Sequence, residues 1–282
     1  MNRLKQIHKR AVFLSLFLFG SIASFAQDGE EQHLSEKPIV VVVASYNNAE
    51  YYEKNLDSIF SQNYTNYRVV YLDDSSPDGT GPLVEDYLQK NGETNRTTLF
   101  QNKKRVGAGA NYYKGVWACK PYEIVACLDG DDWFAHENVL KKLNSVYSNP
   151  NVWVTYGQFA YHPCGTIGWA AQVPDDVIAK NGFRDRAWVT TALRTFYAGL
   201  YHKIKKNDLL YNGDFFPMAQ DLAYMWPILE MAGTHSRFIP EILYIYNIET
   251  PINDVKIDRK FQQKLGLHIR TRKRYQPVKS PY

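Results

Sequence analysis

The sequence predicts an α/β domain built on a mostly parallel central sheet. Three runs of β-branched and apolar residues, at 39–44, 67–72 and 123–128, have the continuous pattern of strands that are buried on both faces. Segments with helical spacing separate these runs, and this alternation is typical of right-handed βαβ crossovers. We therefore expect a sheet flanked by helices, followed by a more helical C-terminal part.

The other elements follow from the spacing of apolar residues. Helices are expected over 52–60, 83–88 and 112–117, between the three strands. Residues 161–186 are irregular and rich in Gly, Pro and polar residues, and such long irregular segments are usually functional or mobile. The remaining expected elements are a helix at 137–147, a strand at 152–159, helices over 191–204 and 220–231, and one or two strands within 237–248.

Charge is distributed unevenly along the 282 residues. The segment 27–255 holds 20 basic and 28 acidic residues, whereas the basic tail 256–282 holds nine basic residues and one acidic residue. Because the main segment is acidic, it lacks the basic surface that nucleic-acid binding requires, and we expect no nucleic-acid partner. The tail could contact acidic lipid at a membrane surface, but a short charge run is more often a solvated terminus, which we favour.

The first 26 residues have the pattern of a secretory signal peptide. A basic stretch (1–10) precedes an apolar stretch (11–26) that ends in small residues and is short for a membrane-spanning helix. An uncleaved signal anchor is the alternative. In both cases we expect the protein in the secretory pathway or associated with a membrane, with a polar linker at 27–37 before the folded domain.

Polar residues follow each of the three predicted strands. They are Ser45-Tyr46-Asn47-Asn48, Asp73-Asp74-Ser75-Ser76 and Asp129-Gly130-Asp131-Asp132. Because the carboxyl ends of parallel strands meet at one edge of a sheet, these residues should surround one crevice. Asp129 and Asp131 flank a glycine, so their carboxylates could hold a divalent ion that bridges diphosphate oxygens. The alternative is an Asp- and Gly-rich turn without a metal.

Three stretches of the sequence resemble family 2 glycosyltransferases, whose Rossmann-like fold is called GT-A. They are VVVVASYNNAEYYEKNLDSIFSQNYTNYRVVYLDDSSPDGT from Val40, RVGAGANYYKG at 105–115 and LDGDDWF at 128–134. The resemblance implies inverting transfer of a sugar from a nucleotide-diphosphate donor, which we expect to be a UDP-sugar. It also implies Mn²⁺ or Mg²⁺ at the D-x-D motif, and an acceptor that is a glycan, a protein or a lipid.

The resemblance also implies domain limits and residue roles. The glycosyltransferase domain would cover 38–255, with a donor-binding half at 38–159 and an acceptor half at 160–255. Gly107 would begin a helix whose free backbone N–H groups favour the negative charge of the donor. Asp129 and Asp131 would hold the metal. The implied donor-binding residues are Ser45, Tyr46, Asn47, Asp73, Asp74, Gly107, Asn111 and Asp129.

The acceptor side of the site is expected to contain a catalytic base. Inverting transfer needs a group that accepts the proton of the acceptor hydroxyl, and Asp221 stands where the family usually has an acid-Asp pair. Gln220 replaces the first member of that pair, which is a departure from the family pattern. The alternative is that Asp221 is only a helix N-cap. Trp169, Trp188 and Tyr197 could stack on sugars, although aromatic residues belong more often to the core.

Two other functions are open at this point. Gln220, together with Asn247-Ile248-Glu249 where the family often has Arg and His, is compatible with an inactive module that binds a nucleotide sugar or a glycan. A sugar nucleotidyltransferase would share the fold and the metal chemistry, but it should have a glycine-rich loop with a basic residue after the first strand. Ser45-Tyr46-Asn47-Asn48 has neither feature, so the transferase interpretation is favoured.

Overall fold

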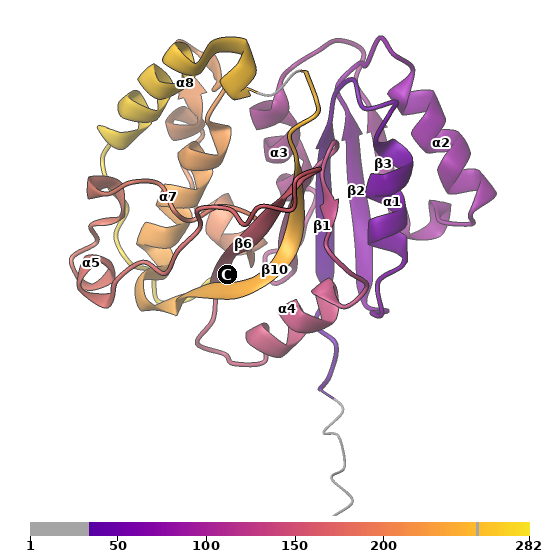
Figure 1. The fold of residues 1–282 in the computed structure, drawn as a ribbon. Helices are drawn as coiled ribbons and strands as arrows, with labels where there is room; N and C mark the ends of the chain where they lie inside the picture. The colour runs from indigo at the N-terminus through magenta and orange to yellow at the C-terminus, as the bar shows by residue number, and fades with distance from the viewer. Residues whose placement is uncertain (1–33, 252–253) are drawn as a thin grey trace, which may run out of the picture. The chain divides into compact units, whose positions relative to one another are not determined.

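The computed structural model describes residues 34–251 and 254–282, which form one unit. Within these residues a mixed eight-stranded sheet has the order β3-β2-β1-β4-β7-β6-β10-β5 (Figure 1). The predicted signal peptide or anchor at 1–26 and most of the predicted linker lie outside the described residues. The strands are β1 (Ile39–Ser45), β2 (Tyr67–Asp73), β3 (Thr97–Gln101), β4 (Ile124–Asp129), β5 (Trp133–Phe134), β6 (Val154–His162), β7 (Arg194–Tyr197) and β10 (Ser236–Asn247).

Strands β1, β2 and β4 form the parallel centre of the sheet, as predicted. β1 pairs with both of the others, and all of its residues are buried. A strand that is covered on both faces has no solvent side, which explains its run of valines. β3 was not predicted, because it is a partly exposed edge strand whose sequence, TTLFQ, carries only two apolar residues.

The sheet continues beyond β4 with a change of direction. β7 is antiparallel to both β4 and β6, and β10 pairs with β6 in parallel along nine registered positions from Ser236 to Asn247. The short β5 is antiparallel to β10. The sheet is therefore mostly parallel, which confirms the predicted class.

The predicted helix over 191–204 is wrong in its first half. Residues 194–197 form β7, and only α6 (Ala198–His202) is helical. Phe196 stacks on Tyr201 on one face of the sheet, whereas the Thr195 hydroxyl bonds to Thr155 and Tyr147 on the other. Because both faces of this strand are buried, its sequence carries no period-two signal that could separate strand from helix.

Helices cover both faces of the sheet (Figure 1). α3, α6 and α7 contact one another on one face, and α1, α2 and α4 cover the other. A Cβ atom on Gly115 would lie 2.6 Å from the Val42 side chain and 2.9 Å from that of Leu72, so glycine lets α3 lie directly on the sheet. The helices are α1 (Tyr52–Phe60), α2 (Thr80–Lys90), α3 (Ala108–Trp117), α4 (Val139–Tyr147), α5 (Asp175–Ala179), α7 (Gln220–Ala232) and α8 (Asp254–Arg270).

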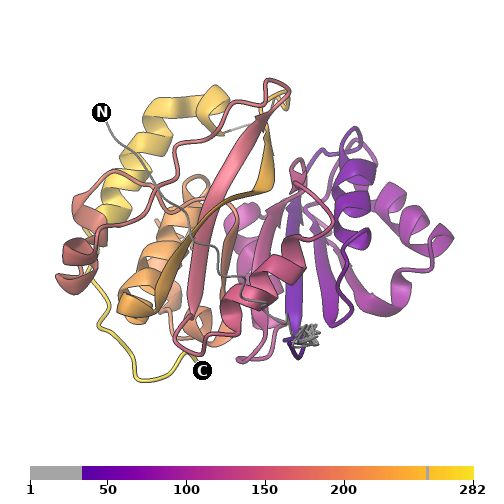
Figure 2. The ribbon, with the colours of Figure 1, turned by 60° about the horizontal axis from the view of Figure 1, so that its bottom comes forward.

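The basic tail is a packed part of the fold, which corrects the expectation of a solvated terminus. It begins within α8, the yellow helix in Figure 2, which contacts α7. Leu265 and Ile269 of this helix are buried. After α8, Arg272 donates hydrogen bonds to the carbonyl oxygens of Asn207 (2.8 Å) and Leu210 (2.6 Å). Basic side chains here satisfy main-chain carbonyl groups. No helix within the described residues has the length and apolar character needed to span a membrane.

Candidate active site

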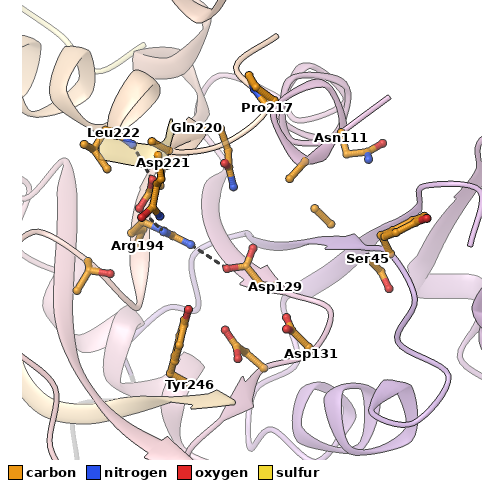
Figure 3. A pocket seen from close by; sticks show the side chains of 18 of the residues that line it. Ser45, Asn111, Asp129, Asp131, Arg194, Pro217, Gln220, Asp221, Leu222 and Tyr246 are labelled. Atoms are coloured by element: carbon orange, nitrogen blue, oxygen red, sulfur yellow. Dashed lines mark hydrogen bonds and ion pairs between the residues drawn. The ribbon is translucent and has the colours of Figure 1, made fainter. Parts of the chain in front are cut away.

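A cavity of about 480 Å³ opens at the carboxyl edge of the sheet. The ends of β1, β2 and β4, the start of β7, the N-terminus of α7 and part of α8 surround it (Figure 3). Among the predicted site residues, Asn47 and Asp73 do not line the cavity. Those that do are Ser45, Tyr46, Asp74, Gly107, Asn111, Asp129, Asp131 and Asp221.

The turn after β1 is held by its own polar residues. The Ser45 hydroxyl accepts a hydrogen bond of 2.9 Å from the Asn48 amide. Asn47 has a left-handed φ of 56°, which Asn tolerates better than most residues, and its N–H donates to the Ser76 hydroxyl at 3.0 Å. Asn47 therefore shapes the turn, while Ser45 and Tyr46 face the cavity.

The two aspartates after β2 have different surroundings. Asp73 is buried and accepts a hydrogen bond of 2.5 Å from the Ser76 hydroxyl, which places it in the turn rather than in the cavity. Asp74 accepts hydrogen bonds from the backbone N–H groups of Val106 (2.8 Å) and Gly107 (2.7 Å). Because these charge-assisted bonds join two separate segments, Asp74 fixes the loop before α3 next to the end of β2.

The N-terminus of α3 presents polar groups to the cavity. Gly107 precedes the helix with a φ of +89°, a conformation that favours glycine. The Asn111 Oδ1 atom accepts a hydrogen bond from Asn102, but its buried Nδ2 has no partner among the described residues. The Arg105 guanidinium lies 3.8 Å from the centre of the Tyr46 ring. This wall therefore combines hydrogen-bond donors with a flat aromatic surface.

Three aspartates lie at the end of β4, and they differ in burial. Asp129 accepts a hydrogen bond of 2.7 Å from the Tyr112 hydroxyl. Asp132 is buried and accepts a hydrogen bond of 2.5 Å from the Tyr244 hydroxyl. Burial, reinforced by the charges of Asp131 and Asp129, raises the pKa of Asp132 well above its usual value. Asp132 thus belongs to the structural support of the turn, and all three line the cavity.

Gly130 brings the D-x-D turn against the turn after β1. A Cβ atom at this position would lie 2.5 Å from the Asn48 amide nitrogen and 2.6 Å from Ser45. No cluster of three or more His, Cys, Asp and Glu side chains in the described part of the chain is spaced to hold a metal ion. Two adjacent carboxylates are nevertheless the protein ligands with which Mg²⁺ or Mn²⁺ is commonly held when a substrate phosphate completes the site. Asp129 and Asp131 fit that ion.

Arg194 joins the two sides of the cavity. Its guanidinium lies 3.3 Å from an Asp129 carboxylate oxygen and 3.2 Å from one of Asp221 (Figure 3). The Arg194 side chain is only 7% exposed. A cation buried to this extent must be paired, and here it is paired with both carboxylates at once.

Asp221 lies in the first turn of α7. The residue that caps this helix is Ala219, so the alternative that Asp221 is the N-cap is wrong. Burial raises the pKa of the Asp221 carboxyl, and the neighbouring Arg194 charge opposes this shift. Gln220 also lines the cavity, and its side chain points into it (Figure 3).

The wall on the side of β6 and β10 contains aromatic residues. Trp169, Trp188 and Tyr246 line the cavity there. Tyr197, the third aromatic residue proposed from sequence for sugar stacking, is buried instead, with its ring edge-on to Tyr147. Tyr197 therefore belongs to the core.

From sequence, Arg194 belongs to a segment, Arg194-Thr195-Phe196, that resembles part of the acceptor side in the family, but no role is assigned to it, and Tyr112 and Tyr244 are not assigned to the site. Each of them contacts Asp129, yet they come from β7, α3 and β10. Tyrosines in apolar helices and strands resemble core residues, and only the fold brings them to one carboxylate. The sequence does contain a signal for Arg194. It is a lone arginine in the mostly apolar segment 192–197, and an arginine that is buried in such a segment needs an anionic partner.

Residues 40–222 match the family described as Glycosyl transferase family 2. The chain belongs to this family. GlyA of Streptococcus pneumoniae serotype 4, a glycosyltransferase, is 27% identical over 178 residues, which are 60% of this chain and 25% of GlyA. The putative glycosyltransferase EpsH of Bacillus subtilis is 31% identical over 99 residues, 35% of this chain and 27% of EpsH. The chain thus matches about a quarter of the length of each relative.

Solved structures of glycosyltransferases share the GT-A fold of this family 2 member. S. aureus TarS 1–349 in complex with UDP-GlcNAc superposes with a TM-score of 0.55 at 18% identity, covering 74% of this chain and 58% of that one. The mannosyltransferase PcManGT of Pyrobaculum calidifontis, in complex with GDP-Man and Mn²⁺, superposes with a TM-score of 0.56 at 19% identity. The latter match covers 86% of this chain and 67% of the other. The GT-A fold predicted from sequence is confirmed.

Proposed function

We propose that this protein transfers a sugar, with inversion, from a nucleotide-diphosphate donor to an acceptor hydroxyl. The observation that carries the proposal is one cavity with Asp129 and Asp131 on one side and Asp221 on the other, joined through Arg194. Family membership and the nucleotide-sugar complexes of two structural neighbours support the same chemistry.

The donor would lie along the carboxyl edge of the sheet. Ser45, Tyr46 and Asp74 would contact the nucleoside, since they line the cavity at β1 and β2. Asp129 and Asp131 would hold Mn²⁺ or Mg²⁺ together with diphosphate oxygens. When bound, that ion neutralises the charge that develops on the leaving diphosphate. We propose a UDP-sugar as the donor.

The acceptor would be activated by Asp221. Its carboxylate takes the proton of the acceptor hydroxyl while the acceptor oxygen bonds to the anomeric carbon. The bond between that carbon and the diphosphate oxygen breaks, and the nucleoside diphosphate leaves with the electron pair. A carboxyl whose pKa is raised by burial is a stronger base than an exposed aspartate, which suits this role.

A second function is favoured by one observation, the amide of Gln220 where an acid would stand. A module that binds the donor without turnover would keep every donor contact described above. It would differ from the enzyme only in failing to release nucleotide.

One titration tests both functions. The full chain is mixed with UDP-glucose, UDP-GlcNAc or GDP-mannose, with Mn²⁺ or with EDTA, and both heat of binding and release of nucleoside diphosphate are measured. We expect binding that requires Mn²⁺, together with slow release from one UDP-sugar. Binding without release, with or without added acceptors, would support the inactive module. No binding of any donor would refute both.

A further inference from the structure

The order of strands divides the cavity into three parts. Tyr46 and Asp74 belong to the β1 and β2 end, and Asp129 and Arg194 lie at β4 and β7 in the middle. The β6 and β10 end is left without a role by the proposed donor site. Trp169, Trp188 and Tyr246 line this end, and Gln262 and Gln263 of α8 line the same cavity.

Trp169 is exposed but held in place. Trp169 is 53% exposed, whereas most large apolar residues in the described part of the chain are buried. The indole N–H donates a hydrogen bond of 3.1 Å to the Trp188 carbonyl oxygen, and the ring stands at 90° to that of Phe159. With its only polar atom already bonded, the indole offers a fixed apolar face to a ligand.

The backbone around Trp169 is fixed to β6 on both sides. The N–H of Gly168 donates to the Phe159 carbonyl oxygen at 2.8 Å, and the Gln158 side chain donates to the Ala170 carbonyl oxygen at 3.0 Å. A Cβ atom on Gly168 would lie 2.3 Å from the Phe159 ring, so only glycine lets the chain lie this close. Two bonds to β6 and the indole bond to Trp188 therefore hold this loop in place. The exposed position of the indole is a fixed feature of the fold.

Gln262 and Gln263 of α8 also present amide groups to this cavity. No hydrogen bond within the described residues holds the side chains of Gln262 or Gln263, which both line the cavity. A pyranose ring combines an apolar face with hydroxyl groups at its edge. It can stack on Trp169 and hydrogen-bond to amides, whereas an alkyl chain would offer those amides no hydrogen bond.

We propose that Trp169 forms an acceptor subsite that stacks a sugar ring, so that the acceptor of this enzyme is a carbohydrate. The inference rests on the proposed transferase function, because it uses the donor assignment to locate the acceptor. The sugar hydroxyl that reacts would lie on the side of Asp221, which lines the same cavity.

The test compares W169A with W117A in the full chain. Trp117 is a matched control, because it is 49% exposed on α3 and does not line the cavity. The probes are methyl glycosides of glucose, galactose, mannose and N-acetylglucosamine, with octanol as an acceptor without a sugar ring. Release of nucleotide is measured with each of them.

We expect a methyl glycoside to stimulate release, and W169A to raise the KM for it about tenfold, which corresponds to about 1.4 kcal/mol. W169F should recover most of this loss, the KM for the donor should change less than twofold, and W117A should resemble the parent chain. An unchanged acceptor KM in W169A, or stimulation by octanol alone, would overturn the subsite.

The subsite can also be tested if the proposed transferase function is wrong, because sugar binding is then measured without turnover. If no donor is turned over, binding of the same glycosides is followed by quenching of tryptophan fluorescence. Quenching that W169A abolishes and W117A keeps supports the subsite without catalysis. Absence of quenching in the parent chain refutes it.

Discussion

Arg194 sets the electrostatic balance of the site. It is one buried cation that faces two carboxylates, and Asp131 adds a third negative charge to the same cavity. The cavity therefore carries an excess of negative charge near Asp129, which a divalent cation would neutralise. The same guanidinium opposes the effect of burial on Asp221. A single side chain thus links the proposed metal site to the proposed base.

Replacing Arg194 by Gln should change the pH dependence of transfer. Burial raises the pKa of Asp221 and Arg194 lowers it, so removal of the cation raises this pKa further. Because a general base acts when deprotonated, kcat/KM falls as the pH drops through that pKa. We expect the acidic limb of the kcat/KM profile to move to higher pH in R194Q and to stay in place in R194K. An acidic limb at the same pH in R194Q would contradict this role of Arg194.

Asp131→Asn should abolish metal-dependent transfer without unfolding the protein. The amide keeps the size of the side chain but removes the negative charge that would hold the ion, so we expect a loss of about 100-fold or more in kcat. D176N, at an exposed position of α5, is the control. Activity is measured over a range of Mn²⁺ concentrations, and circular dichroism reports the fold. Normal turnover in D131N would remove Asp131 from the metal site.

At the scale of elements, a strand or helix could be predicted from sequence where its own residues have a distinct hydrophobic pattern. The run of valines in β1 and the long apolar segment of α7 are local signals, and both elements were predicted. β7 carried no such signal, because it has only four residues, RTFY, which are buried on both faces and lack a run of β-branched side chains. The position of the D-x-D residues and of Asp221 at the cavity could be predicted, since they lie at the end of β4 and at the start of α7. The two ion pairs of Arg194 could not be predicted, because they depend on the position of β7 in the sheet.

Gly115 and Gly266 form a matched pair for testing how closely helices pack. A Cβ atom on Gly115 would meet core side chains of Val42 and Leu72, whereas one on Gly266 of α8 would meet only Leu222 at 3.6 Å. We expect G115A to lower the free energy of unfolding by about 1–3 kcal/mol through overpacking. G266A should raise it by about 0.5–1 kcal/mol, because alanine favours helix. Urea denaturation measures both, and equal effects would contradict this description of α3.

At the scale of the molecule, the C-terminal segment connects the core to the cavity. Arg184 and Glu230 form a buried ion pair, with side chains 2% and 0% exposed. Arg184 also donates to the Ile269 carbonyl oxygen at 2.8 Å, and Glu230 accepts from the Tyr275 N–H at 2.9 Å. The last turn of α8 and the segment that follows it are therefore both bonded to this pair. Since α8 contributes part of the cavity wall, the pair also fixes that wall.

Arg184→Met should be strongly destabilising, because it leaves the Glu230 charge buried without a partner. We expect a loss of about 3–5 kcal/mol in the free energy of unfolding, measured by urea denaturation near pH 7. Burial already raises the pKa of Glu230 and Arg184 lowers it, so R184M should recover part of its stability as the pH falls and Glu230 takes up a proton.

Two further variants separate the buried charge from general loss of contacts. R184M/E230M removes both charges and should be more stable than R184M, but less stable than the parent chain, since the Ile269 carbonyl and the Tyr275 N–H lose their partners. K180A breaks the exposed pair with Asp176 and should change stability by about 0–1 kcal/mol. If R184M cost no more than K180A, the pair would not hold the C-terminal segment. In that case the placement of α8 against the cavity would depend on the packing of Leu265 and Ile269 and on hydrogen bonds such as those of Arg272.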